Sequence, residues 1–142
     1  MNSQAKTLSC WFKNGSDQGQ AVSVSVMLEG WDDDGAAGIG PMENPLRAGV
    51  YGTQGRSWSD YGPRAGIWRL LDLPATEKVQ ADFYASGIVA ERYPEVMTTV
   101  AGAWHPVAAH SWSLHMIPAY LSREDEIADI GRCTSVIERS TG

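Results

Sequence analysis

Three short apolar runs, separated by helical patterns, constrain the fold of this 142-residue chain more than any other feature of its sequence. Residues 21–30 (AVSVSVMLEG) place valines at every second position, which is the pattern of a β-strand. Residues 78–87 (KVQADFYASG) and 106–111 (PVAAHS) predict two further strands. Because strands that alternate with helices form parallel sheets with right-handed crossovers, we expect an α/β fold.

Helices are predicted between these strands. Pro63 suits the first turn of a helix, where its missing N–H costs nothing, and Pro74 is expected to end that helix. Residues 88–103 predict a short helix that is broken at Pro94 and continues for a turn or two beyond it. The apolar face of the first helix is formed by Ile67, Leu70 and Leu71.

The last helix is predicted to begin at Ser122. Asp125 lies three residues later, which is the spacing of a capping box, although Glu is the usual residue there. The buried face of this helix is expected to consist of Ile127, Ile130 and Ile137.

Two segments show no regular spacing of apolar residues. Residues 1–20 are polar and are interpreted as an N-terminal arm that precedes a single domain at 21–142. Residues 31–62 are rich in glycine but also carry aromatic and arginine side chains, and they predict a long loop. Loops of this length inside a compact domain are usually functional or disordered, and the tryptophans favour a functional loop.

Composition excludes several classes of function. A hydrophobic share of 43% can support a core, and the net charge of −6 with scattered Lys and Arg disfavours a nucleic-acid partner. No apolar run is long enough to span a membrane, and the first residues lack the apolar block of a secretory signal. We therefore expect a cytoplasmic protein in which Cys10 and Cys133 are free thiols.

Two polar clusters follow predicted strands. In a parallel sheet, functional groups gather beyond the carboxyl ends of the strands. A carboxylate with two imidazoles is a common ligand set for a divalent metal, which can activate water. The alternatives are a solvated acidic turn and structural histidines. The first cluster holds Glu29, Asp32, Asp33 and Asp34, and the second holds His110, Ser111 and His115.

Two tryptophans adjoin these clusters. Trp31 and Trp112 are expected at the rim of the site, where a flat ring could stack on a sugar or a planar heterocycle. A position in the core is the alternative for both, as it is for Trp58, Trp68 and Trp104.

Taken together, residues 21–142 resemble the polysaccharide deacetylase family, whose domain is called NodB-like. The resemblance implies a partial (β/α) barrel with parallel strands and flanking helices. It also implies metal-assisted hydrolysis of amide bonds other than peptide bonds, either in N-acetylated sugars or in ring amides such as allantoin and cyclic imides. It rests on four ordered stretches: SVMLEG, YGPRAGIWRLLDL, VQADFYASGIVAERYPEV and GAWHPVAAHSWS.

The resemblance also implies roles for single residues. Family members carry two adjacent aspartates after the first strand, where this chain has Leu28 and Glu29, so Asp32 is the candidate for the second carboxylate. The second histidine of the family motif comes four residues after the first, whereas here it comes five after. The implied catalytic residues are Glu29 and Asp32, the ligands of a divalent metal such as zinc are His110, His115 and Glu29, and the substrate-binding residues are Arg64, Trp112 and Trp31.

Family domains continue through an arginine segment, an acidic-aromatic segment and a late catalytic histidine. The chain is therefore interpreted as the front half of the domain, which pairs with another copy or with a companion chain that supplies the second half. The open edges of a partial barrel favour such association. The main alternative is a catalytically incomplete fragment that acts as an assembly or binding module. A metal-free enzyme that uses carboxylates alone is a third hypothesis.

Overall fold

The computed structural model describes residues 23–32 and 52–142 of the chain. Three strands, β1 (Ser25–Leu28), β2 (Asp82–Ala85) and β3 (Val107–Ala109), form one parallel sheet in the order β1-β2-β3. The predicted parallel α/β sheet is therefore confirmed. The predicted arm at residues 1–20 lies outside the described residues.

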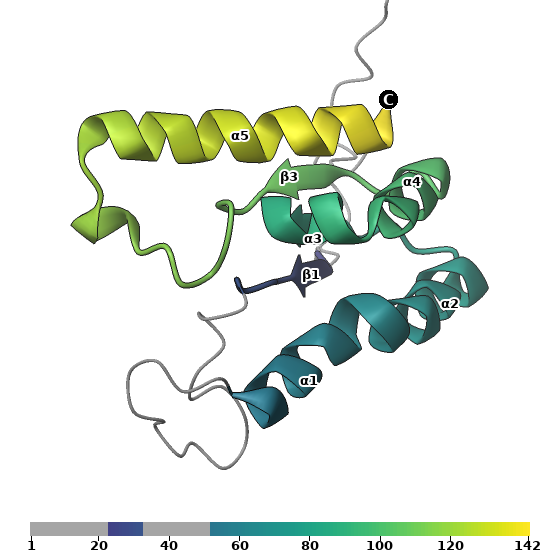
Figure 1. Cartoon of the computed structure of the whole chain (residues 1–142). Coiled ribbons are helices and arrows are strands. Elements are labelled where there is room, and N and C mark those ends of the chain that lie inside the picture. Colours follow the sequence, from purple (N-terminus) through teal and green to yellow (C-terminus); the bar gives the residue numbers. More distant parts are fainter. Residues whose placement is uncertain (1–22, 33–51) are drawn as a thin grey trace, which may run out of the picture.

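Helices follow each strand, as Figure 1 shows. Helix α5 packs against α3, α4 and β3, while α1, η2 and α2 follow one another as one rod on the side of β1. The break predicted at Pro94 separates α3 from α4. The helical elements are α1 (Thr53–Tyr61), the π-helix η2 (Gly62–Gly66), α2 (Ile67–Glu77), α3 (Gly87–Arg92), α4 (Pro94–Gly102), the 3-10 helix η3 (Pro118–Tyr120) and α5 (Arg123–Thr141).

The two faces of the sheet differ in burial. The register aligns Val26 with Phe83 and Val107, and this row packs into the core together with apolar residues of α3, α4 and α5. The next row along the strands is Met27, Tyr84 and Ala108, and all three are exposed. Since alternate residues point to opposite faces of a strand, helices cover one face, and no element within residues 23–32 and 52–142 covers the other. We call the second one the open face.

The first helical region departs from the sequence-based expectation. Residues 53–61 were predicted as loop but form α1, and helix α2 continues through Pro74 to Glu77. Proline lacks the N–H that would donate to the carbonyl four residues earlier, and the helix ends within one further turn. The helix ends at Lys78, which adopts a left-handed conformation with φ of 55° and donates its N–H to the carbonyl of Pro74.

The last helix begins as predicted but turns a different face to the core. The N–H of Asp125 donates to the hydroxyl of the N-cap Ser122 at 3.1 Å. Ile127 and Ile130 are exposed, because the first turns of α5 lie beside the loop after β3 and not over the sheet. The buried face is formed by Cys133, Val136 and Ile137, of which only Ile137 was expected. No helix in the described ranges could span a membrane.

A buried histidine makes the stability of this fold depend on pH. The Nδ1 atom of His105 accepts a hydrogen bond from the N–H of Ala81 at 3.3 Å, and its ring lies 5.2 Å from that of Phe83. Burial lowers the pKa of His105 below its ordinary value of 6.5. The unfolded chain therefore binds more protons than the fold just below pH 6.5, so acid favours unfolding.

We expect the free energy of unfolding to hold its full value above pH 6.5 and to fall as the pH drops from there through the lower pKa of the folded state. Urea unfolding at neutral pH and at weakly acidic pH measures the change. A His105→Asn variant can keep the acceptor for Ala81 but does not titrate, so it should lose less stability over the same range. An equal loss in both proteins would assign the pH dependence to other groups.

Candidate functional site

Serine 86 ties the carboxyl ends of the three strands together. It follows β2 directly and is fully buried. Its N–H donates to the carbonyl of Leu28, while its hydroxyl accepts from the N–H of Gly30 and donates to the carbonyl of His110, both at 3.4 Å. One small side chain thereby fixes the residues that follow β1 and β3 relative to each other.

Glu29 and His110 meet at this edge of the sheet. Each is the first residue after its strand, so each continues the alternation that places Met27 and Ala108 on the open face. The Oε1 atom of Glu29 lies 3.7 Å from Nε2 of His110, and both side chains are 34% exposed. The His110 ring also meets Tyr84 edge-on, at 6.5 Å between centroids. A carboxylate and an imidazole thus stand together where solvent can reach them.

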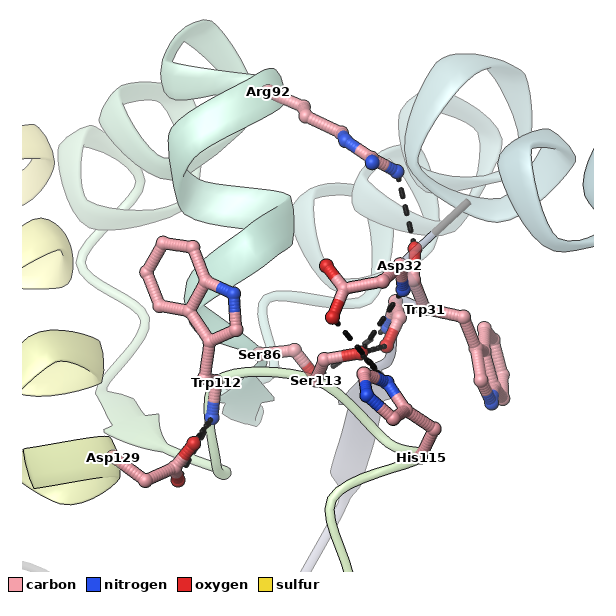
Figure 2. Close-up of polar contacts among 9 residues, drawn as sticks. Trp31, Asp32, Ser86, Arg92, Trp112, Ser113, His115 and Asp129 are labelled. Atoms are coloured by element: carbon pink, nitrogen blue, oxygen red, sulfur yellow. Dashed lines mark hydrogen bonds and ion pairs between the residues drawn. The ribbon is translucent and has the colours of Figure 1, made fainter. Parts of the chain in front are cut away.

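Asp32 and His115 form a second pair, shown in Figure 2. Oδ2 of Asp32 lies 3.4 Å from Nδ1 of His115, and the hydroxyl of Ser113 lies 2.9 Å from the same nitrogen. The buried Ser113 hydroxyl also accepts the N–H of Asp32 at 3.0 Å. The carboxylate of Asp32 and the hydroxyl of Ser113 contact the same ring nitrogen, so they orient the His115 ring. Because the Ser113 hydroxyl is buried, it is not placed to act as a nucleophile.

The side chain of Trp112 is largely buried in the wall of the site. The side chain is only 6% exposed, and a Cβ added to Gly87 would lie 2.6 Å from the ring atom Cε3. The guanidinium carbon of Arg132 lies 3.2 Å from the ring centroid, and the backbone N–H of Trp112 donates to the carboxylate of Asp129. Arg132 thus already stacks on this indole, and the predicted contact of Trp112 with substrate stays a prediction.

The other two predicted substrate-binding residues lie differently. Trp31 is half-buried, its carbonyl accepts from Nη1 of Arg92 at 3.1 Å, and its indole points away from that of Trp112 in Figure 2. Arg64 is exposed in η2, where its carbonyl accepts the indole N–H of Trp68. No contact found among the described residues joins Arg64 to either acid–imidazole pair.

The loop that carries His110 is held by the thiol of Cys133. Ser111 has a left-handed backbone with φ of 58°, which is uncommon outside glycine. Its carbonyl accepts from Sγ of Cys133 and from the N–H of Gly87, both at 3.0 Å. Burial raises the pKa of the Cys133 thiol, so it stays protonated and can donate. Cys133 is a free thiol as predicted, while Cys10 lies outside the described residues.

The side chains at this edge are of the types that bind a divalent metal, but too few of them lie together to form a complete ligand set. Carboxylate and imidazole are both ligands of zinc and similar ions, and Glu29 with His110 supplies one of each. In residues 23–32 and 52–142, no three His, Cys, Asp or Glu side chains lie close enough to hold an ion together. The expected set of Glu29, His110 and His115 is therefore not assembled within this part of the chain, since His115 lies against Asp32.

The sequence profile of the polysaccharide deacetylase family matches residues 59–142, which is more than half of the chain. This chain belongs to the polysaccharide deacetylase family. The matched segment contains His110 and His115, whereas Glu29 and Asp32 precede it.

Solved structures similar to this family member share its fold. A probable polysaccharide deacetylase from Pseudomonas aeruginosa PAO1 has a TM-score of 0.68 at 22% identity, and the match covers 84% of this chain and 44% of that one. Puue allantoinase also has a TM-score of 0.68, at 19% identity, with 84% and 43% covered. A putative polysaccharide deacetylase from Mycobacterium smegmatis has a TM-score of 0.60 at 25% identity, with 84% and 41% covered.

The chain thus spans less than half the length of each of these structures. The sheet and its flanking helices match part of their folds, which confirms the expected NodB-like architecture. No curated protein is similar in sequence at a significant level.

Proposed function

We propose that this polysaccharide deacetylase-family chain takes part in hydrolysing amide bonds other than peptide bonds. The substrate would be an N-acetylated sugar or a small ring amide. The single observation that carries the proposal is the Glu29–His110 pair, which stands at the carboxyl edge of a parallel sheet in a member of this family. Functional sites of α/β folds gather at this edge.

Amide hydrolysis needs a group that takes a proton from the attacking water. We assign this role to the carboxylate of Glu29, because it is partly exposed and is held at the strand ends that Ser86 ties together. Asp32 is assigned the lesser role of orienting His115 through Nδ1, which leaves Nε2 of that ring as the atom that could exchange a proton with substrate. Trp31 and Trp112 are the aromatic candidates for contact with substrate.

A divalent cation, of which zinc is the leading candidate, is part of the proposal. His110 would hold it together with one carboxylate oxygen of Glu29, and the other oxygen of Glu29 would remain available to take the proton. Further ligands would come from outside the described ranges or from another chain. When bound, such an ion would polarise the amide carbonyl and make water more acidic. Without the ion, the carboxylates of Glu29 and Asp32 would have to act alone, which is the competing mechanism.

A hydrolysis assay tests the function. The purified protein is incubated with N-acetylglucosamine oligomers, with allantoin and with a cyclic imide, and released acetate or the ring-opened product is measured. We expect product from one of the two substrate classes, a loss of turnover with a chelator and recovery with added zinc. Turnover that survives complete removal of metal would support the carboxylate mechanism, whereas absence of product from both classes with zinc present would contradict the proposed activity.

A binding or assembly module is the second candidate function. It is favoured by Leu28, which is buried in the core where family members carry a carboxylate, and by the open face of the sheet. Saturation-transfer NMR with the same oligomers distinguishes the two candidates, because a module of this kind would bind without turning the ligand over.

A further inference from the structure

A cavity at the amino edge of the sheet has features that the candidate site does not use. It measures about 310 Å³ and lies where the connection from α2 to β2 meets the connection from α4 to β3. We infer that this cavity binds a small organic anion, namely a carboxylate carried on a single ring. The inference goes beyond the proposed function and does not depend on it, because Glu29 and His110 lie at the opposite, carboxyl edge.

Trp104 is the first of these features. It follows Ala103, the C-cap residue of α4. Its N–H donates to the carbonyl of Ala101, and the N–H of His105 donates to that of Val100. This pattern is a Schellman motif, in which the residue after the C-cap is left-handed and is most often glycine. Trp104 has φ of 64° there and is 80% exposed, so neither backbone preference nor burial accounts for a tryptophan at this position. Such a residue favours a role in binding.

A second left-handed residue lines the same cavity. Lys78 ends α2 with φ of 55°, and among the described non-glycine residues only Lys78, Trp104 and Ser111 have a positive φ. Two of these three therefore line one cavity. Residues in sparsely populated backbone conformations cluster at sites that hold a ligand. Gln80 joins the two connections, because its side-chain amide donates to the carbonyl of Trp104.

His105 contributes a hydrogen-bond donor to the cavity. It lines the cavity and is only 7% exposed. Its Nδ1 accepts from the N–H of Ala81, and burial lowers its pKa, so at neutral pH the ring is uncharged and Nε2 carries the proton. Within the described part of the chain, Nε2 has no hydrogen-bond partner, and no side-chain atom there is both enclosed and unpartnered. This N–H is therefore available to an acceptor on a ligand.

The charge of the lining favours an anion. Lys78 is the one cation among the described residues that line the cavity, and none of these residues is Asp or Glu. A carboxylate could accept from the Lys78 ammonium and from Nε2 of His105, and hydrogen bonds between charged partners are the stronger kind. The remaining lining is largely apolar and consists of Leu71, Pro74, Ala75, Val79 and Ala103.

The size and the exposed indole of the cavity define the body of the ligand. Ligand pockets range over roughly 300–1,000 Å³, and a cavity of about 310 Å³ lies at the lower end, which suits a single ring. A ring of this size can stack on the flat face of Trp104 while its carboxylate reaches Lys78. Sugar acids and aromatic acids share this chemistry, and the experiment distinguishes them.

Isothermal titration calorimetry at neutral pH with sodium glucuronate and with sodium benzoate tests the inference. We expect one of the two acids to bind at one site per chain. The matching uncharged amide, glucuronamide or benzamide, should bind at least about 10-fold more weakly, because it cannot form a charged pair with Lys78. The acid that binds shows whether the ring is a sugar or an aromatic ring.

Three variants assign the binding to this cavity. Trp104→Gly removes the indole and suits the left-handed backbone, so it should weaken binding at least about 10-fold without lowering the urea midpoint. Lys78→Asn removes the ammonium, and Asn tolerates a left-handed backbone, so this protein should no longer prefer the acid over its amide. The matched control is Trp58→Ala, an exposed tryptophan of α1 outside the cavity lining, which should bind as the parent does.

Three results would overturn the inference: no binding of either acid, equal binding of acid and amide, or unchanged binding by a folded Trp104→Gly protein. Should Trp104→Gly fail to fold by circular dichroism, Trp104→Asn removes the same ring and also tolerates the left-handed backbone. Failure of the proposed function is separate, because a Glu29→Gln protein without turnover should bind the acid as the parent does.

Discussion

Replacing Glu29 with Gln is expected to lower kcat for amide hydrolysis by roughly 10²- to 10⁴-fold, the range found for loss of a general base. Gln keeps the size of the side chain but cannot take a proton from water. The fold should persist, because the side chain is 34% exposed and the contact it would weaken is a 3.7 Å ion pair to His110. Steady-state kinetics on the substrate identified in the hydrolysis assay gives the change, and urea unfolding checks the fold.

Comparison variants make this result specific. Glu77→Gln removes an exposed carboxylate at the end of α2 and should leave kcat unchanged. His110→Asn should be nearly as harmful as Glu29→Gln, and His115→Asn less so, because His115 lies with Asp32 and not with Glu29. If Glu29→Gln retained full turnover while Glu77→Gln behaved identically, the role of Glu29 would have to be given up.

The second large effect is expected at Gly87. A Cβ there would lie 2.6 Å from the ring of Trp112 and 3.1 Å from the Cα of Cys133. Neither neighbour can yield easily, since Arg132 covers the ring and Cys133 belongs to the buried face of α5. Gly87→Ala should therefore lower the free energy of unfolding by about 1–3 kcal/mol, as overpacked cores do. Urea unfolding measures it.

Gly131→Ala is the matched control for this prediction. Gly131 also lies in a helix, but a Cβ there would meet no atom within 4 Å. Alanine is the better helix former, so this change should raise the free energy of unfolding by about 0.5–1 kcal/mol. A Gly87→Ala protein as stable as the parent would contradict the prediction, because Trp112 and Cys133 would then be able to move away from the added methyl group.

Sequence patterns predicted the sheet well and helix burial less well. The valines at alternate positions located β1, Gly87 marked the end of β2, and Pro94 located the break between α3 and α4. These signals act within a few residues, so the sequence alone reveals them. Helix α1 was missed because glycine and serine lower its local helix propensity. Burial of Cys133 in place of Ile127 depends on where α5 crosses the sheet, and this is a property of the assembled fold.

The contacts of the candidate site were likewise predictable only in part from the sequence. The meeting of Glu29 and His110 follows from topology, because parallel strands end at one edge and both residues come directly after their strands. The choice of Asp32 as the companion of His115 depends on the path of the loop after β3, which no periodicity encodes. Ser86 and Ser113 gave no signal, since small hydroxyl residues are frequent near strand ends and reveal their contacts only in three dimensions.

Three residues within two turns of α5 contact the loop that carries His110. Asp129 accepts a hydrogen bond from the backbone N–H of Trp112, Arg132 stacks on the Trp112 indole, and Cys133 donates to the carbonyl of Ser111. The backbone N–H groups of Gly87 and Ile88 donate to carbonyls of the same loop. Slow exchange of these two amide protons with deuterated solvent would therefore report that the loop is held against the fold. The order of this edge of the sheet can thus be followed without any substrate, and a tag or fusion that pulls on α5 would loosen the loop that carries His110.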